Sequence, residues 1–350
     1  MGVSVAETNA MVNLFRRELE LCKVSDGETI AVLSEAERSI EYASAFMIAA
    51  RDLGADVFNV NLPGSSNGGG MGVAGDVGQN ALAGNQPAIE ALKSADLVVD
   101  LIFLLFSKEQ LEIQDHGTRV LLVVEPFEVL ARLFPTQSLR DRVEAGEALL
   151  AKASNLRFTN AAGTDVSYDI GKFPILTEYG FTDAPGRWDH WPGGFLATQG
   201  NETGVDGRVV MDRGDILFPF NKYVQEPIEF TIRGGKIVDI RGGFDAVLIK
   251  EYMNSFNDPR AFSISHIGWG LNELARWDYL ATGAETVGMD ARAFYGNVLF
   301  STGPNVELGG TNDTACHLDL PMKGCDLYLD DELIVQHGDI VPNDMKALVR

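Results

Sequence analysis

Two short apolar runs in the first half of the chain place the strongest limit on its fold. Asp96–Leu101 is apolar apart from its two aspartates, and Arg119–Val124 apart from Arg119, as expected of strands buried on both faces of a sheet. Helical periodicity alternates with such runs, which is typical of a parallel sheet covered by helices on both faces. The other strand-like runs are Thr29–Leu33 and Ala55–Leu62, and the helical ones are Val5–Lys23, Glu41–Leu53, Asn85–Lys93 and Leu139–Ala153. Residues 1–154 are therefore expected to form an α/β domain.

From residue 155 onward glycine and proline become frequent and short β-rich segments dominate. The run Glu229–Ile240 is interrupted by Gly234 and Gly235, which predicts a β-hairpin. Residues 155–350 are thus expected to form a β-rich α+β domain. Its other strand candidates are Arg208–Met211, Cys325–Leu329 and Leu333–Gln336, and its helix candidates are Ala246–Phe256 and Asn272–Tyr279.

Composition excludes several classes of partner. The chain has 350 residues and a formal net charge of −22, and such a negative surface repels phosphate backbones and anionic lipid. The longest apolar stretch, Leu97–Phe106, contains Asp100 and is too short to span a bilayer. The N-terminal residues do not contain the basic segment followed by an apolar segment that is typical of a signal peptide, so none is expected. Three scattered cysteines predict no disulfide framework, which favours a cytoplasmic protein. From the charge and the short apolar stretch we expect that it binds neither nucleic acid nor membrane.

A glycine cluster at residues 68–72 follows a predicted strand and invites comparison with phosphate-binding loops. It lacks the Lys-Ser/Thr of a P-loop and the glycine spacing of a dinucleotide fold. We interpret it as a flexible connection and predict no nucleotide cofactor.

Three residues near the C-terminal end have the chemistry of a metal site. His317 and Asp319 are separated by one residue, so on a β-strand both side chains project from the same face. His266, within Ser265-His-Ile-Gly-Trp-Gly, offers a second imidazole. Two histidines and one carboxylate are the ligand set of mononuclear non-haem iron(II) sites with open coordination positions. The sequence therefore predicts a metalloenzyme.

Two further residues are candidates for acid–base chemistry, each with a simpler structural interpretation. His190 lies between Trp188 and Trp191 in a segment that reads as a loop, which can build an aromatic pocket with one proton-transfer group or pack as a loop core. Glu178, in Thr177-Glu-Tyr-Gly, is by itself expected to be a solvated carboxylate. Cys316 adjoins His317 but points to the opposite face of a strand and is expected to be buried.

Long motifs in the chain resemble known families. The run Gly309-Gly-Thr-Asn-Asp-Thr-Ala-Cys-His-Leu-Asp-Leu-Pro-Met resembles the C-terminal ligand motif of the M29 aminopeptidase clan. Over nearly its whole length the chain is more similar to the bacterial 2,5-dihydroxypyridine 5,6-dioxygenases of nicotinate catabolism. The stretches that carry this similarity are Glu125–Arg132, Thr177–Gly180, Pro185–Pro192, Phe256–Pro259, Ile264–Leu271, Met289–Asn297, Leu299–Asn305 and Asp326–Asp331.

The resemblance implies an N-terminal α/β domain and a C-terminal metal-binding domain of M29 aminopeptidase type. It also implies an Fe(II)-dependent, extradiol-type enzyme that converts 2,5-dihydroxypyridine and O₂ to N-formylmaleamate. Where the clan has a glutamate ligand this chain has His266, and where the clan has a histidine it has Leu299. These changes predict one ion bound by His266, His317 and Asp319 instead of two. An M29-type metalloaminopeptidase, or a non-catalytic metal-binding protein, remains the alternative.

Roles for other residues follow from the same resemblance. His190 is expected to act as the base that deprotonates the substrate, because histidine has an intrinsic pKa of about 6.5. Glu178 is expected to orient His190 or to hold the substrate. Trp191, Phe300 and Ser301 are expected to line the substrate pocket. Relatives in the clan assemble, so a homo-oligomer is expected.

Overall fold

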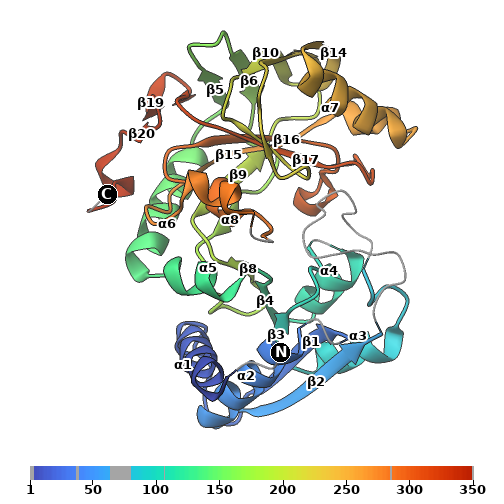
Figure 1. Cartoon of the computed structure of the whole chain (residues 1–350), viewed down its shortest axis with the longest axis vertical. Helices are drawn as coiled ribbons and strands as arrows, with labels where there is room; N and C mark the ends of the chain where they lie inside the picture. The colour runs from blue at the N-terminus through green and yellow to red at the C-terminus, as the bar shows by residue number, and fades with distance from the viewer. Residues whose placement is uncertain (1–3, 37–38, 64–79, 106, 284–285, 349–350) are drawn as a thin grey trace. The chain divides into compact units, whose positions relative to one another are not determined.

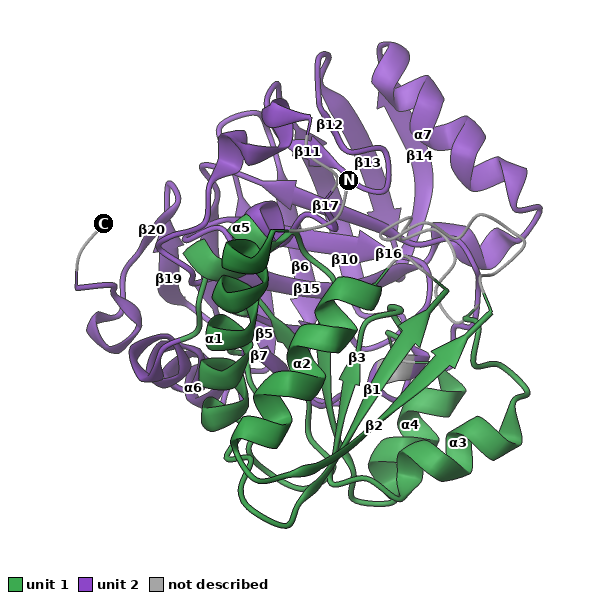
Figure 2. Ribbon diagram, turned by 60° about the horizontal axis from the view of Figure 1, so that its bottom comes forward, with its two compact units in different colours: residues 1–73, 78–135, 179–193 green, residues 74–77, 136–178, 194–350 purple. Residues whose placement is uncertain are grey.

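The structure is a computed structural model that describes residues 4–36, 39–63, 80–105, 107–283 and 286–348. The described chain divides into two compact units (Figure 2). One contains the residues up to 135 together with 179–193, and the other contains 136–178 and the residues from 194 onward. The chain thus returns to the first unit after residue 178, and a domain boundary at 154 stays a prediction. The glycine cluster at 68–72 lies outside the described residues.

The first unit contains a parallel five-stranded sheet in the order β2-β1-β3-β4-β8 (Figure 1). Four of these strands and three of the helices agree with the sequence-based prediction to within a few residues. The strands are β1 (Thr29–Glu35), β2 (Asp56–Leu62), β3 (Leu97–Asp100), β4 (Arg119–Val123) and β8 (Trp188–Trp191). The helices are α1 (Val5–Leu21), α2 (Ile40–Asp52), α3 (Gln86–Lys93), α4 (Lys108–Asp115) and α5 (Phe127–Arg132).

Helices cover both faces of this sheet, as the alternating pattern predicted. The chain moves from β1 to β2 in one direction and from β3 to β4 in the other, and right-handed crossovers then place α2 and α4 on opposite faces. Helix α1 packs on α2, and α3 packs on α4. The buried strands β3 and β4 lie near the middle of the sheet, which explains why neither shows alternation in its sequence.

The second unit contains two large sheets. The eight-stranded sheet has the order β14-β13-β10-β6-β5-β18-β19-β20, and the five-stranded sheet has the order β17-β16-β15-β9-β7; all their strand pairs are antiparallel. The first is built from β5 (Asn155–Thr159), β6 (Asp165–Asp169), β10 (Val205–Met211), β13 (Ile228–Arg233), β14 (Lys236–Gly242), β18 (Asp326–Leu329), β19 (Glu332–Gln336) and β20 (Asp339–Ile340). The second is built from β7 (Leu176–Glu178), β9 (Phe195–Gln199), β15 (Ile264–Gly270), β16 (Val298–Thr302) and β17 (Leu318–Met322).

The predicted hairpin is confirmed, but one predicted helix is not. Strands β13 and β14 pair through a turn in which Gly234 and Gly235 both have positive φ. The segment expected to be helical around Asn272–Tyr279 forms a turn followed by a 3-10 helix at Trp277–Thr282. The remaining strands and α-helices are a short ribbon, β11 (Ile216–Leu217) with β12 (Lys222–Tyr223), and the helices α6 (Gln137–Leu150), α7 (Phe244–Ser255) and α8 (Met289–Arg292).

The two sheets of the second unit form a layered core. Phe300 of β16 is fully buried, and its ring lies 6.4 Å from Phe158 and 5.7 Å from Phe230, both in the eight-stranded sheet. Figure 1 shows α8 on the other side of the five-stranded sheet. One face of that sheet therefore packs in the core between the two sheets. The opposite face can carry polar side chains. No helix within the described ranges is long and apolar enough to cross a bilayer.

Candidate metal centre

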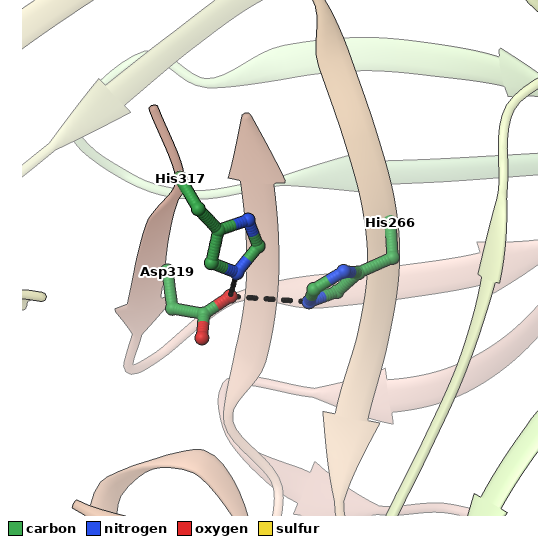
Figure 3. A group of neighbouring side chains, drawn as sticks. All are labelled: His266, His317 and Asp319. Atoms are coloured by element: carbon green, nitrogen blue, oxygen red, sulfur yellow. Dashed lines mark ion pairs between the residues drawn. The ribbon is translucent and has the colours of Figure 1, made fainter. Parts of the chain in front are cut away.

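Three side chains of the second unit converge on one point (Figure 3). Oδ1 of Asp319 lies 3.1 Å from Nε2 of His266 and 3.2 Å from Nε2 of His317. The three potential ligand atoms all lie within 4.8 Å of one another. Among the residues that the structure describes, this is the only group of three or more His, Cys, Asp or Glu side chains arranged to hold an ion.

Sheet pairing explains why these three residues meet. Asp319 of β17 pairs with Ser301 of β16, and directly paired residues project from the same face of a sheet. His317 precedes β17 and shares this face because it is two residues from Asp319. His266 lies on β15, the next strand, at an irregularity in register between Ile264 and Ile267. The ligands therefore come from neighbouring strands of one sheet.

Ser301 fixes the backbone of His266 at this irregularity. Its Oγ accepts a hydrogen bond of 2.8 Å from the His266 N–H and donates one of 3.2 Å to the His266 carbonyl. The Ser301 side chain is fully buried, so these bonds replace the ladder bonds that a regular pair would make. Ser301, which the sequence suggested as a substrate contact, thus has its hydroxyl engaged with a ligand residue.

The electrostatic environment keeps Asp319 ionised. Burial by itself raises the pKa of this carboxyl, but the charges and polar contacts of His317, Arg292 and His266 outweigh burial and hold the pKa well below its usual range. Arg292 donates from Nε to Oδ2 of Asp319 at 2.8 Å. Asp319 therefore carries a negative charge toward the two imidazole nitrogens.

The donor set fits a divalent transition-metal ion. Imidazole and carboxylate ligands bind such ions at about 2.0–2.2 Å, so two ligands at right angles are separated by about 3 Å. The two separations from Oδ1 of Asp319 match this value. Oδ1 is buried, yet no donor among the described residues meets it with hydrogen-bond geometry. An ion bound between the three side chains would satisfy this oxygen.

Comparison with known proteins decides the family. A model of the 2,5-dihydroxypyridine 5,6-dioxygenase family matches residues 10–342. A curated 2,5-dihydroxypyridine 5,6-dioxygenase from Pseudomonas putida is 46% identical over 99% of this chain and 100% of its own length. The chain belongs to this family. It is accordingly a dioxygenase, and therefore an oxidoreductase.

Solved structures agree with the family and extend the fold relationship. The 2,5-dihydroxypyridine dioxygenase of Pseudomonas putida superposes with a TM-score of 0.94 at 45% identity, covering 99% of this chain and 100% of that one. AmpT from Thermus thermophilus, an M29 aminopeptidase, superposes with a TM-score of 0.66 at 12% identity, covering 97% and 100%. The predicted fold of M29 aminopeptidase type is thus confirmed, and the second likeness concerns the fold alone.

The five-stranded sheet of this dioxygenase also carries Glu178. Glu178 pairs with Phe195 of β9, and Gln199 of the same strand pairs with His266. Phe195 and Gln199 are four residues apart, so their side chains project from the same face of the sheet. Glu178 and the three metal-site residues therefore share one face. Phe195 lies between them, with its ring 6.3 Å from that of His266.

Phe300 does not join the metal site. It is adjacent to Ser301 on β16 and so projects from the opposite face, where it packs into the core between the sheets. Leu299 takes the place expected for Phe300, because it shares a face with Ser301 and packs with Phe195 and Ala197. The structure thus gives Phe300 a core-packing role in place of the suggested substrate contact.

His190 and Trp191 belong to the first unit. The segment expected to be a loop is strand β8, in which His190 pairs with Leu122 of β4. Trp191 has no exposed surface, because its ring packs edge-on against Phe15 and Phe134 at 5.8 Å each. The structure gives Trp191 a packing role in place of the suggested substrate contact.

Sequence reasoning missed Arg292 as a component of this site, and it named Leu299 only as the residue that replaces a histidine ligand of the clan. Arg292 lies in a stretch shared with the dioxygenase family, Met289–Asn297, which was the only signal that could have drawn attention to it. Its contact with Asp319 joins α8 to β17 and depends on tertiary packing that no local pattern reveals. Cys316, by contrast, is buried as its position beside His317 predicted.

Proposed function

We propose that this dioxygenase cleaves the ring of 2,5-dihydroxypyridine between C5 and C6 with Fe(II) as its cofactor. Both atoms of O₂ enter the product, N-formylmaleamate. The observation that carries the proposal is the convergence of His266, His317 and Asp319 in a chain of this family. Such a ligand set with open positions is typical of non-haem Fe(II) oxygenases.

The protein groups around the site support iron rather than a closed structural ion. Fe(II) bound by the three residues would supply the one-electron chemistry that O₂ needs to react with a closed-shell ring. The two imidazoles and one carboxylate leave the ion with a net positive charge, which favours binding of an anionic substrate. Within the described part of the chain the ligand group has three members, too few for the two ions of a hydrolytic centre.

The sheet face beside the ligands is suited to a flat, partly apolar ring. Phe195, Ala197 and Leu299 form one buried cluster there, and the ring of Phe195 lies 6.3 Å from that of His266. Glu178 adds a carboxylate to the same face and is only 7% exposed. We propose that Glu178 holds a polar edge of the substrate, its ring N–H or 2-hydroxyl, while the apolar cluster contacts the ring.

His190 is our candidate for the base that removes the proton of the 5-hydroxyl. A phenol-like proton is lost poorly at neutral pH, and histidine is the side chain whose intrinsic pKa suits the task. Its place on β8, next to the buried Asp189 that accepts the His190 N–H at 2.8 Å, fixes the backbone of the residue. Its catalytic role stays a prediction.

Oxygen uptake tests the proposed function directly. Protein loaded anaerobically with Fe(II) is expected to consume one O₂ for each 2,5-dihydroxypyridine lost, followed by the decay of ring absorbance. His317→Ala should abolish both uptake and bound iron. In the same assay His190→Gln should keep its iron and lose about 10²–10⁴-fold in rate, the usual size of a general-base contribution. The exposed His337, whose side chain is 77% accessible, provides the matched control His337→Gln.

Two outcomes would contradict the proposal. Full turnover by zinc-loaded, iron-free protein would exclude iron chemistry, because zinc has no redox activity. Release of amino acids from peptides without O₂ consumption would instead support the M29-type aminopeptidase that the shared fold leaves as the alternative.

A further inference from the structure

We infer that Arg292 is a positioning residue that restricts Asp319 to a single metal–oxygen bond and so keeps coordination positions open. The inference rests on the proposed metal site. It concerns how many bonds the protein makes to the ion, a property that the identity of the three ligands does not determine.

The two oxygens of Asp319 have different partners. Oδ1 faces Nε2 of both histidines, at 3.1 and 3.2 Å, where an ion would lie. Oδ2 accepts the hydrogen bond from Nε of Arg292 at 2.8 Å. Both side chains are almost buried, with 9% and 11% of their surface exposed, so solvent does not weaken this pair. A carboxylate held in this way offers only Oδ1 to the ion.

Arg292 is itself held from several directions. Its Nη1 donates to the carbonyl of Val287, and its guanidinium lies 4.1 Å from the centre of the Phe218 ring. The backbone N–H of Phe218 in turn donates to the carbonyl of Asp319 at 3.1 Å. Phe218 therefore contacts both partners of the ion pair, one through its ring and one through its backbone.

The glycine that precedes α8 makes room for this arrangement. Gly288 has a φ of +95°, and a Cβ atom there would lie 2.3 Å from the Phe218 ring and 3.0 Å from Nη1 of Arg292. Helix α8 is fixed at its end by Asn297, whose Nδ2 donates to the carbonyls of Ala291 and Arg292. Several contacts, and not one alone, therefore fix the position of the Arg292 guanidinium.

A single bond from Asp319 matters for the number of open positions. A six-coordinate ion bound through one atom of each of three residues keeps three positions for other ligands. A carboxylate that binds through both oxygens, as carboxylates also do, would leave two. A ring that binds through two atoms together with O₂ needs three. Arg292 accordingly preserves a third open position, which would allow a ring to bind through two atoms beside O₂.

Water relaxation on the Mn(II)-loaded protein tests the inference without any turnover. The enhancement of water proton relaxation reports how many exchangeable waters Mn(II) carries. In Arg292→Gln both oxygens of Asp319 become available, so the bound-water contribution should fall by about a third, from three waters to two. Mn(II) affinity should stay the same or rise, because a positive charge near the ion has been removed.

Arg276→Gln is the matched control. Arg276 pairs with the exposed Asp278 and does not contact Asp319 through its side chain, so this variant should keep wild-type relaxation. Unchanged relaxation in Arg292→Gln, or loss of Mn(II) from a folded variant, would overturn the inference. If Arg292→Gln does not fold, Arg292→Met, which also has no group that can donate to Oδ2, is judged by the same criteria. Failure of wild-type protein to bind Mn(II) would contradict the metal site itself, and is distinguishable from failure of this inference.

Discussion

The contacts of the Ser301 hydroxyl distinguish two roles that the sequence left open, namely positioning a metal ligand and contacting the substrate. The Ser301 side chain makes two hydrogen bonds to the backbone of His266, so it is expected to position a ligand. Ser301→Ala should weaken metal binding about 10–100-fold, as loss of an outer-shell partner usually does, and should leave the KM of the residual activity unchanged. Competition with a chelator of known affinity measures the first quantity.

The neighbouring threonine provides the control for this prediction. Thr302 is buried on the same strand, and its Oγ1 forms no hydrogen bond with any residue that the structure describes. Thr302→Val removes this hydroxyl and should leave metal affinity unchanged. If Ser301→Ala instead kept full metal affinity and raised KM for 2,5-dihydroxypyridine, Ser301 would be the substrate contact that the sequence suggested.

Residue spacing predicted part of the site and misplaced another part. The interval between His317 and Asp319 was enough to place both on one strand face, and the structure confirms that their side chains meet. The same rule excludes Phe300 and Ser301 from lining one pocket together, because they are consecutive on β16. Applying it required knowing that Val298–Thr302 is a strand, and the continuous burial of β16 gave no alternation from which to infer this.

Among the strands of the parallel sheet, β8 was not predicted, because its own sequence shows no strand pattern. Strand β8 has four residues, Trp188–Trp191, between glycine- and proline-containing segments, and it looks like a loop when read alone. It becomes a strand by pairing in parallel with β4, which lies more than sixty residues earlier in the chain. Pairing between distant segments leaves no periodic signal in either segment. Longer runs such as β1 and β13 were predicted because they carry their own pattern.

The turn before β11 carries a buried acid that should make stability depend on pH. Burial raises the pKa of Asp215 to about 7, although the carboxylate accepts hydrogen bonds from the N–H groups of Lys323 and Asp212. The folded state thus keeps this proton to a higher pH than the unfolded chain, whose Asp has a pKa of about 3.9. The stability contribution is complete below about pH 4 and is lost as pH rises toward about 7.

Comparison of wild type with Asp215→Asn isolates this contribution. The free energy of unfolding of wild type minus that of the variant should fall by a few kcal/mol, as an order of magnitude, between about pH 4 and about pH 7, and stay constant above. Urea denaturation at several pH values measures it. A difference that is flat with pH would show that Asp215 ionises in the folded protein at its ordinary pKa.

Across the whole molecule, the two sequence patterns correspond to a parallel sheet in the first unit and antiparallel sheets in the second. Strand–helix alternation is a local pattern, so it predicted the parallel sheet, and frequent turns predicted the antiparallel ones. The return of residues 179–193 to the first unit could not be predicted, because it is decided by β8 joining β4. The expected homo-oligomer and cytoplasmic location stay predictions.

The division into two units predicts where metal binding stabilises the molecule. All three proposed ligands belong to the second unit, on β15 and β17 or directly before β17. A ligand that binds only the folded state stabilises it by about 2.7 kcal/mol at one hundred times its Kd. Local opening of the five-stranded sheet separates the ligands and must release the ion, whereas opening of β1, β3 or β4 leaves the ligand set intact.

Hydrogen exchange measured with and without Mn(II) tests this expectation. Amides of β15, β16 and β17 should exchange up to about a hundredfold more slowly when the site is saturated, in proportion to the ratio of metal concentration to Kd. Amides of β1, β3 and β4 should change little. In His317→Ala, Mn(II) should protect neither set, which controls for binding to the acidic surface, where the net charge of −22 attracts cations elsewhere. Equal protection of both sheets in wild type would mean that the units open together, and the metal would then stabilise the molecule as one cooperative body.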